Sequence, residues 1–241
     1  MSILVIGSCA SNEVAQMMKH SAKVHGLEVH LYAVGGSMGS CHGGDIQGSW
    51  AIDVMKQVNA THILSVDPPD VLLLADEAEI MEKFRSFDNG MVVSAENNCV
   101  APVAGVREFM ESIPGRHSFV NIGCWFGERL CAIEVMQKSI DRYRNKPLEP
   151  SFNLDSPGAW FMYGMMHGTL DFALDRESVM FQSTNGWSRA DIEVREGRIY
   201  NKATRTWPIA VHYNGSASEQ YAPCKEMFQT LFGGSGNGNL P

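Results

Sequence analysis

The order of short apolar runs and helical segments at the start of this 241-residue chain constrains its fold more than any other feature. Ile3 to Ile6 is an apolar run of strand length, Asn12 to His25 carries apolar residues at helical spacing, and Leu27 to Val34 is a second apolar run. Gly26 is placed to end the helix. The sequence therefore predicts a βαβ unit, and with it an α/β fold with a mostly parallel, Rossmann-like sheet flanked by helices.

Later segments continue this alternation. Met91 to Ala95 has the composition of a buried strand, and Pro157 suits the first turn of a helix. The other expected strands and helices are Ser118 to Gly127, Leu130 to Tyr143, Leu170 to Leu174, Val179 to Phe181 and Ile209 to His212, with a further helix at Trp50 to Val58. We expect residues 1–232 to form one domain, and the glycine-rich residues 233–241 to be a flexible tail.

A glycine-rich segment follows the second expected strand. Glycines at 35, 36, 39, 43, 44 and 48 surround Asp45. Glycine allows positive φ and a close approach of the main chain to a ligand, so the segment suits a phosphate- or base-binding loop, and judged alone it equally fits a flexible loop. The loop after the first strand, Gly7 to Ser11, lacks the G-x-G-x-x-G pattern, which argues against a nicotinamide-dependent enzyme.

Two acids stand where the apolar run His62 to Val66 ends, in the sequence Asp67-Pro68-Pro69-Asp70. Ligands of open α/β sheets bind beyond the carboxyl ends of strands, so both carboxylates are well placed for chemistry. The two prolines stiffen the connection. Two acids three positions apart can share a hard divalent cation such as Mg²⁺ or Mn²⁺, although aspartates are also common as turn-forming residues.

The formal net charge of -8 disfavours nucleic acid as a partner, because the sequence has no basic stripe to neutralise phosphates. An enzyme acting on nucleic acid can nevertheless confine its basic groups to one groove.

No apolar run approaches the roughly 18 residues that cross a bilayer, and Ile3 to Ile6 is too short for the core of a signal peptide. The six cysteines are scattered without a CxxC pair, which is typical of reduced thiols. We expect a cytoplasmic protein without a membrane partner.

Several segments match one family pattern in order and at compatible spacing. They are Gly43-Gly44-Asp45, Asp67-Pro68-Pro69-Asp70-Val71-Leu72, Val92-Val93-Ser94-Ala95-Glu96 with Cys99, Val120-Asn121-Ile122-Gly123 with Phe126-Gly127, Leu174-Asp175-Arg176 with Phe181-Gln182, and His212-Tyr213-Asn214-Gly215. Together they resemble the glycosyltransferase domain of the procollagen lysyl hydroxylases. The resemblance covers about residues 1–215 and implies the GT-A fold, the fold of nucleotide-diphospho-sugar transferases.

The resemblance implies a role for each matching position. Asp67, Asp70 and His212 would be the ligands of the divalent ion, Mn²⁺ or Mg²⁺, that binds the diphosphate of a UDP-sugar. The glycine loop, with Gly43, Gly44 and Asp45, would hold uridine. Asn214, beside Gly215, would contact the phosphates or the ribose.

Two further acids are expected on the side of the sugar or of the acceptor. Glu96 ends a strand at the functional edge, and Asp155 matches the acidic position before a helix in the family. Either could accept sugar hydroxyls, or act as a general base if burial raises its pKa. Helix capping or a surface charge are the ordinary alternatives for both.

The resemblance implies a metal-dependent glycosyltransferase that moves a hexose from a UDP-sugar to a hydroxyl acceptor. The sequence departs from the family pattern at both prolines between the acids, at Val100 and at Tyr213, positions that concentrate around the sugar and the acceptor. Metal and nucleotide handling therefore transfers better than the identity of the acceptor. Two alternatives stay open: a non-catalytic module that binds a nucleotide-sugar or a glycan, and a transferase that glycosylates modified DNA bases.

Overall fold

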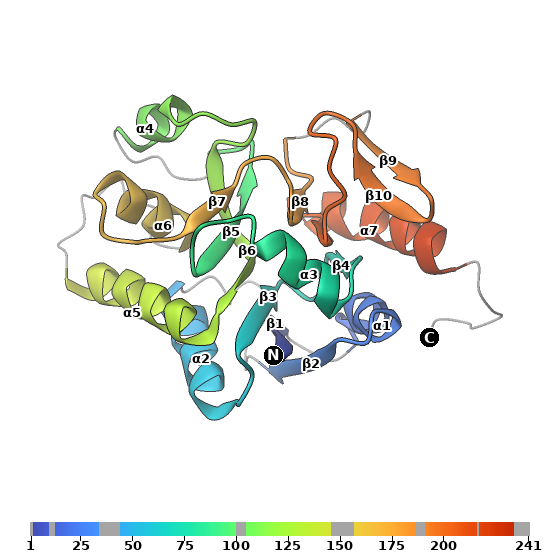
Figure 1. The fold of residues 1–241 in the computed structure, drawn as a ribbon, viewed down its shortest axis with the longest axis horizontal. Helices are drawn as coiled ribbons and strands as arrows, with labels where there is room; N and C mark the ends of the chain where they lie inside the picture. The colour runs from blue at the N-terminus through green and yellow to red at the C-terminus, as the bar shows by residue number, and fades with distance from the viewer. Residues whose placement is uncertain are drawn as a thin grey trace.

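The computed structural model describes residues 2–9, 13–33, 44–99, 105–145, 157–186, 191–215 and 217–233. A six-stranded sheet in the order β2-β1-β3-β6-β5-β7 forms its centre (Figure 1). These strands are β1 (Ile3–Cys9), β2 (Glu28–Ala33), β3 (His62–Val66), β5 (Met91–Glu96), β6 (Phe119–Glu128) and β7 (Ala173–Asp175). The pairs β1–β2, β1–β3 and β5–β7 are parallel, whereas β6 runs antiparallel to both β3 and β5. The α/β class and the mostly parallel sheet are thus confirmed.

A smaller sheet, in the order β4-β11-β8, joins segments from distant parts of the sequence. Its strands are β4 (Val71–Leu73), β8 (Phe181–Ser183) and β11 (Ala210–His212). Strand β11 is antiparallel to β4 and parallel to β8. A separate hairpin consists of β9 (Ile192–Arg195) and β10 (Arg198–Asn201). The small sheet therefore brings the late strand β11 beside the segment that follows β3.

Apolar side chains on the two faces of the central sheet pack into two separate hydrophobic cores, as β1 shows. Leu4 and Ile6 face one core, which α2 (Gly44–Gln57), α4 (Val106–Ser112), α5 (Arg129–Asn145) and α6 (Pro157–Met166) cover. Ile3 and Val5 face the other core, which α1 (Gln16–Val24), α3 (Glu77–Phe84) and the small sheet cover. Helix α7 (Ala217–Phe232) packs on the outer face of the small sheet. The period of two is the one that a sheet buried on both faces requires.

Sequence patterns located most of these elements but shifted some of their ends. Helix α1 begins at Gln16 rather than at residue 12, and Gly26, with φ of 69°, follows its end as expected. Helix α2 begins at Gly44, so Gly44 and Asp45 lie in its first turn and not in a loop. Small and acidic residues are favourable at a helix start, and glycine content alone does not reveal this. Gly43 lies outside the described residues.

The described residues contain no helix that is both long and apolar enough to cross a membrane. Helix α7 ends at Phe232, and of the expected tail only Gly233 is described. The extent of the single domain, residues 1–232, stays a prediction.

Candidate metal centre

Asp67, Asp70 and His212 come together in space. One ligand atom from each of these three residues lies within 4.8 Å of the others. His212 Nε2 is 3.4 Å from Asp70 Oδ1 and 3.6 Å from Asp67 Oδ2. His212 is 3% exposed and Asp67 50%, so the cluster extends from the protein interior to the surface.

Strand ends and a tight turn position the three side chains. Asp67 directly follows β3, and its amide donates to the Gly123 carbonyl at 2.9 Å. In the turn Asp67-Pro68-Pro69-Asp70, the Asp70 amide donates to the Asp67 carbonyl at 3.4 Å. A Cβ atom on Gly7 would lie 2.5 Å from Pro68 Cγ, so the glycine in β1 makes room for this turn.

Pairing of β4 with β11 places His212 beside Asp70. His212 is opposite Val71 in this antiparallel pair, and the Tyr213 amide donates to the Asp70 carbonyl at 2.9 Å. Backbone hydrogen bonds thus bring together Asp70 and His212, which 141 residues separate in the sequence. This explains why local sequence patterns could not join the two residues.

The electrostatics of the cluster are those of an anionic site. Burial lowers the pKa of His212, but the Asp70 carboxylate, with further contributions from Asp67 and Glu96, outweighs it and raises that pKa to about 9. The three carboxylates favour a positive charge at this point, which the protonated imidazole provides when no ion is bound. A divalent cation bound to Nε2 would replace that proton and interact with the same carboxylates.

The residues present fit a divalent cation. Two carboxylate oxygens and an imidazole nitrogen form a donor set that suits Mn²⁺, because carboxylates favour hard cations and imidazole favours transition metals. Among the described residues, His212 Nδ1 is buried and has no hydrogen-bond partner, so the contacts of this ring with the site are made through Nε2. Nε2, which faces both aspartates, is the nitrogen placed to bind the ion.

Gly123 is a site residue that the sequence reasoning missed. A Cβ atom there would lie 2.6 Å from Asp67 Oδ2 and 2.9 Å from His212 Nδ1, and would overlap His212 Cε1. The glycine sits in an irregularity of β6, where pairing with β5 jumps from Val93 opposite Trp125 to Ser94 opposite Asn121. A glycine inside an apolar strand signals a bulge or a close approach, and this was the available clue.

Glu96 ends β5 at the same edge of the sheet and is 3% exposed. Its Oε2 accepts hydrogen bonds from Asn214 Nδ2 at 2.7 Å and from Asn185 Nδ2 at 3.2 Å. Burial raises the pKa of Glu96, while the charge of His212 and the amides of Asn121, Asn185 and Asn214 lower it. An acid held by amides in this way is a well-oriented hydrogen-bond acceptor.

Asn214 and Gly215 lie within the described residues, whereas two other expected site residues do not. The Asn214 carboxamide is engaged within the protein, since its Oδ1 accepts from Ser183 Oγ at 2.6 Å and from the Thr184 and Asn185 amides, each at 3.1 Å. Gly215 follows with φ of 150°. Asp155 and Gly43 lie outside the described residues, so their roles stay predictions.

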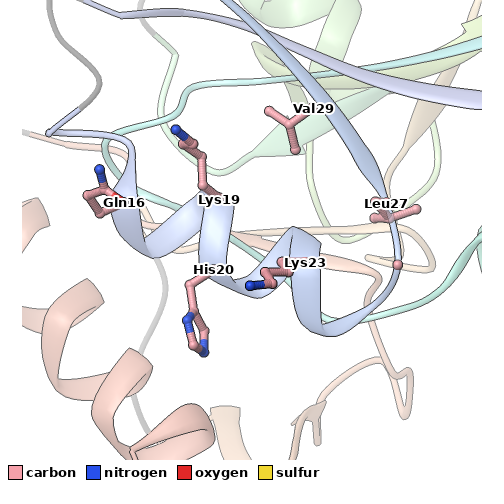
Figure 2. A pocket seen from close by; sticks show the side chains of 7 residues that line it. Gln16, Lys19, His20, Lys23, Leu27 and Val29 are labelled. Carbon is pink, nitrogen blue, oxygen red and sulfur yellow. The ribbon is translucent and has the colours of Figure 1, made fainter. Parts of the chain in front are cut away.

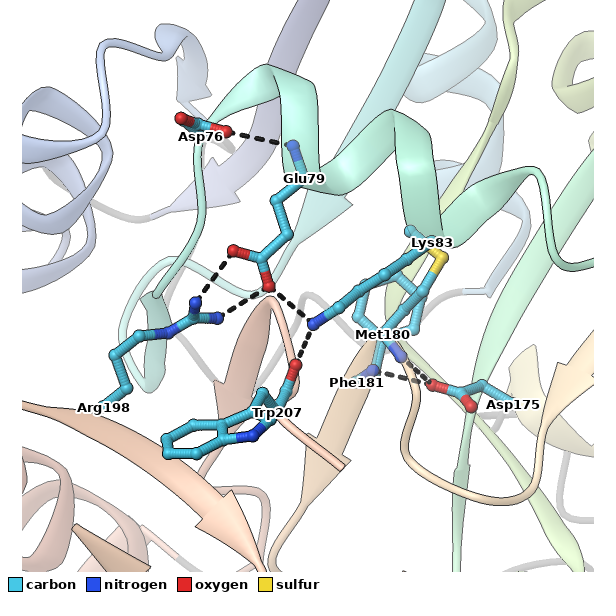
Figure 3. A network of polar contacts seen from close by, with 8 residues as sticks. All are labelled: Asp76, Glu79, Lys83, Asp175, Met180, Phe181, Arg198 and Trp207. Carbon is cyan, nitrogen blue, oxygen red and sulfur yellow. Dashed lines mark hydrogen bonds and ion pairs between the residues drawn. The ribbon is translucent and has the colours of Figure 1, made fainter. Parts of the chain in front are cut away.

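A polar network anchors the segments that lead into β8 and β11 (Figure 3). Glu79 on α3 binds Arg198 through two hydrogen bonds of 2.9 and 2.7 Å and Lys83 at 2.7 Å. Lys83 also donates to the Trp207 carbonyl, five residues before His212. Asp175 accepts from the Val179, Met180 and Phe181 amides, which fixes the turn into β8. These contacts therefore hold in place the segments that lead into β8 and β11, the strand that carries His212.

Two hollows lie elsewhere on the described surface. One, of about 520 Å³, is bordered by α1 and the start of β2, with Lys19, His20 and Lys23 among its side chains (Figure 2). The other, of about 830 Å³, is lined by residues near the start of β3 and by residues just before β5. Neither includes Asp67, Asp70, Glu96 or His212.

Comparison with solved structures defines the class of this fold. A glycosyltransferase involved in glycosylation of the major capsid of PBCV-1 superposes with a TM-score of 0.56 at 11% identity, covering 93% of this chain and all of that one. An active-site mutant of LgtC superposes with a TM-score of 0.51 at 12% identity, covering 95% of each chain. These neighbours are GT-A glycosyltransferases, so the chain has the GT-A fold that the sequence predicted.

Sequence comparison then identifies the family. The profile of the PLOD GT domain matches residues 3–225, and the chain belongs to that family. It is 26% identical over 211 residues to the procollagen-lysine,2-oxoglutarate 5-dioxygenase of Drosophila melanogaster, covering 81% of this chain and 28% of that protein.

Two more relatives match most of this chain but only a part of their own length. An uncharacterized protein of Acanthamoeba polyphaga mimivirus is 24% identical over 200 residues, covering 81% of this chain and 41% of that protein. The multifunctional procollagen lysine hydroxylase and glycosyltransferase LH3 of Homo sapiens is 28% identical over 165 residues, covering 66% of this chain and 21% of that protein. The chain thus spans less than half the length of these relatives.

Proposed function

We propose that this chain is a metal-dependent glycosyltransferase that moves a hexose from a UDP-sugar to a hydroxyl acceptor. The convergence of Asp67, Asp70 and His212 on one point, at the carboxyl edge of a GT-A sheet, is the observation that carries the proposal. The family and fold support a glycosyltransferase.

Asp67, Asp70 and His212 would hold the ion, which when bound would neutralise charge on the diphosphate leaving group. Gly43, Gly44 and Asp45 would hold uridine, and Asn214 with Gly215 would contact the phosphates or the ribose. Glu96 would accept a hydroxyl from the sugar or the acceptor, and Asp155 would act on the same side. Positioning and charge stabilisation supply most of the rate enhancement in such a site.

The proposal places the reaction in the cytoplasm. Among the described residues no disulfide links Cys9, Cys99, Cys124, Cys131 or Cys224, as suits a reducing compartment. The named substrate of the procollagen relatives is not carried over to this chain, because the departures from the family pattern lie around the acceptor.

A screen of nucleotide-sugars tests the proposal. Many transferases slowly hydrolyse their own donor, so release of free UDP from a panel of UDP-, GDP- and ADP-sugars should identify the donor in the presence of Mn²⁺. We expect turnover of a UDP-hexose that EDTA abolishes and that Asp70→Asn lowers by at least about a hundredfold. Binding without turnover across the donors and a broad panel of hydroxyl acceptors would instead indicate a non-catalytic module.

A further inference from the structure

One hollow outside the candidate metal centre is lined by cationic side chains and by no acid. It has a volume of about 520 Å³ and lies between α1 and the start of β2 (Figure 2). Among the seven residues that line it, Lys19 and Lys23 carry a positive charge, and none is Asp or Glu. The chain as a whole has a formal net charge of -8, so this hollow is a positively charged region on an acidic protein.

Three hydrogen-bond donors, here called the donor stripe, follow one another along the outer face of α1: Gln16, Lys19 and Lys23. The two lysines come three and seven residues after Gln16, and this spacing places all three side chains on one face of a helix. The opposite face is buried in the protein and carries Met17, Met18, Ser21 and Ala22. An α-helix advances about 10 Å over seven residues, so the donor stripe extends over that length of the helix.

His20 also lines the hollow but projects away from the donor stripe. Figure 2 shows Lys19 on the same side of α1 as Val29, whereas His20 projects from the other side. There the His20 ring packs edge-on against Phe228 of α7, with 5.3 Å between the ring centroids. The imidazole is therefore engaged with α7, and the polar groups available to a ligand are those of the donor stripe.

The two lysines of the donor stripe have no counter-charge among the described residues, whose ion pairs include neither Lys19 nor Lys23. Helix α5, for comparison, pairs Lys138 with Glu134, four residues earlier, at 2.6 Å. In α1 the residue four positions before Lys23 is Lys19, so two like charges adjoin, which destabilises a helix. An anion bound between the two ammonium groups would relieve this repulsion, and the pair therefore points to an anionic ligand.

Partial burial distinguishes Lys19 from an ordinary surface lysine. Its side chain is half-buried, so the charge is partly removed from water without a carboxylate beside it to compensate. The nearest acids in the sequence, Glu13 and Glu28, are exposed and do not line the hollow. A bound anion would supply the missing compensation.

The chemistry of the donor stripe selects a ligand with several negatively charged acceptors. An ammonium group has three N–H donors and no acceptor, and it binds phosphate as a point charge. Phosphate groups linked in a chain can contact donors spread over about 10 Å of helix, whereas a single phosphate is shorter. Nucleic acid is disfavoured, because it requires more basic groups than two lysines on a chain of net charge -8.

We propose that Gln16, Lys19 and Lys23 form a binding site for a small ligand with linked phosphate groups, separate from the candidate metal centre. The ligand is either an inorganic polyphosphate or a nucleoside triphosphate, which present the same chain of phosphate groups. A nucleoside would add contact with Val29, the half-buried apolar side chain at the start of β2. This site does not depend on the proposed function, because none of the expected metal ligands lines the hollow.

Calorimetry of the full chain with sodium tripolyphosphate and with ATP tests the site and separates the two sources. EDTA is present throughout, so that neither probe can bind through a metal ion. We expect wild type to bind, and Lys19→Gln/Lys23→Gln to weaken the affinity by about tenfold, as the loss of two partly exposed charge contacts predicts. Tighter binding of ATP than of tripolyphosphate indicates a nucleoside triphosphate, and equal affinities indicate an inorganic polyphosphate.

Lys56→Gln/Lys138→Gln is the matched control. It removes the same two charges from exposed positions on α2 and α5, so it changes the net charge of the chain equally. It should leave both affinities within about twofold of wild type, and circular dichroism should show the same fold in both double variants. Lys23→Gln alone, at an exposed position, should weaken binding by about threefold even if the change at Lys19 lowers stability.

Three results would overturn the proposal. In the first, wild type binds neither tripolyphosphate nor ATP. In the second, the control weakens binding as much as Lys19→Gln/Lys23→Gln does, which would assign the effect to net charge. In the third, a polyglutamate peptide binds where neither phosphate probe does, which would show that the hollow takes an acidic peptide. Each of these results leaves the Mn²⁺-dependent binding of UDP untouched, so the failure of one proposal is distinguishable from the failure of the other.

Discussion

At the scale of single residues, the site depends on a side chain that is missing as much as on those present. The space beside His212 and Asp67 exists because residue 123 has no Cβ atom. Asp67 and Asp70 could be predicted as candidate ligands from their place after a buried strand. His212 required the family resemblance, and Gly123 required the fold, because each acts through contacts with distant segments.

Gly123→Ala should weaken Mn²⁺ binding by at least about tenfold, since the added methyl group displaces two proposed ligands. Calorimetric titration of Mn²⁺ measures this directly. Gly127→Ala, in the same strand, is the control: its Cβ would meet the Gly90 carbonyl at 2.8 Å, far from any ligand, so it should cost stability and spare Mn²⁺ affinity. Equal loss of Mn²⁺ affinity in both variants would show that general strain in β6, not contact with the ligands, is responsible.

A double substitution sharpens the assignment. In a His212→Ala background the methyl group of Gly123→Ala no longer meets the imidazole and only the contact with Asp67 Oδ2 remains, so its cost in unfolding free energy should shrink relative to the wild-type background. Urea unfolding of the four chains gives this coupling. Strict additivity would contradict the proposed collision with His212.

His117 should make stability depend on pH. Its ring is buried, with Nε2 3.0 Å from Ser178 Oγ and Nδ1 3.2 Å from Asn97 Oδ1. Burial, with the charges of Arg116 and Arg176, lowers the pKa of His117 to about 4. An unfolded histidine titrates near 6.5, so between these values the unfolded chain binds a proton that the folded chain does not. The stabilisation is therefore complete above about pH 6.5 and is lost as the pH falls toward 4.

Urea unfolding at pH 7.0 and pH 5.0 measures this contribution. The loss of stability on acidification should be greater in wild type than in His117→Gln by roughly 2 kcal/mol. The same pH dependence in both chains would mean that His117 does not titrate in this interval.

At the scale of elements, the short strands explain most of what sequence patterns missed. Strands β4, β8 and β11 have three residues each, too few for a reliable alternation, yet together they deliver His212 to the site. The antiparallel insertion of β6 between β3 and β5 likewise has no local signature. The ends of longer elements such as α5 and β1 were predicted to within a few residues, because their apolar pattern continues over more residues.

The brace around Glu79 should contribute measurably to stability. Glu79→Ala leaves Lys83 and Arg198, both largely shielded, without their carboxylate, and we expect a loss of roughly 1–3 kcal/mol in urea unfolding. Glu134→Ala removes the exposed partner of Lys138 on α5 and should leave the free energy of unfolding almost unchanged. If both substitutions changed the free energy of unfolding equally, the contacts of Glu79 would stabilise the fold no more than a surface ion pair does.

At the scale of the whole molecule, strands β1, β3 and β5 run in the same direction and end at one edge of the sheet. Asp67 directly follows β3 at this edge, and Glu96 is the last residue of β5. This edge was predictable from the βαβ start and from the acids at strand ends. The smaller sheet adds His212 and Asn214 to it from late in the chain. The structural neighbours share this fold, and the chain belongs to the PLOD GT domain family.

The central claim, that Asp67, Asp70 and His212 bind a divalent ion that holds a UDP-sugar, is tested most directly by calorimetry of UDP with and without Mn²⁺. Wild type should bind UDP only with Mn²⁺. Asp70→Asn, Asp67→Asn and His212→Ala should each weaken that binding by at least about tenfold while circular dichroism shows an unchanged fold. UDP binding that needs no metal and that all three substitutions leave unaltered would contradict the account.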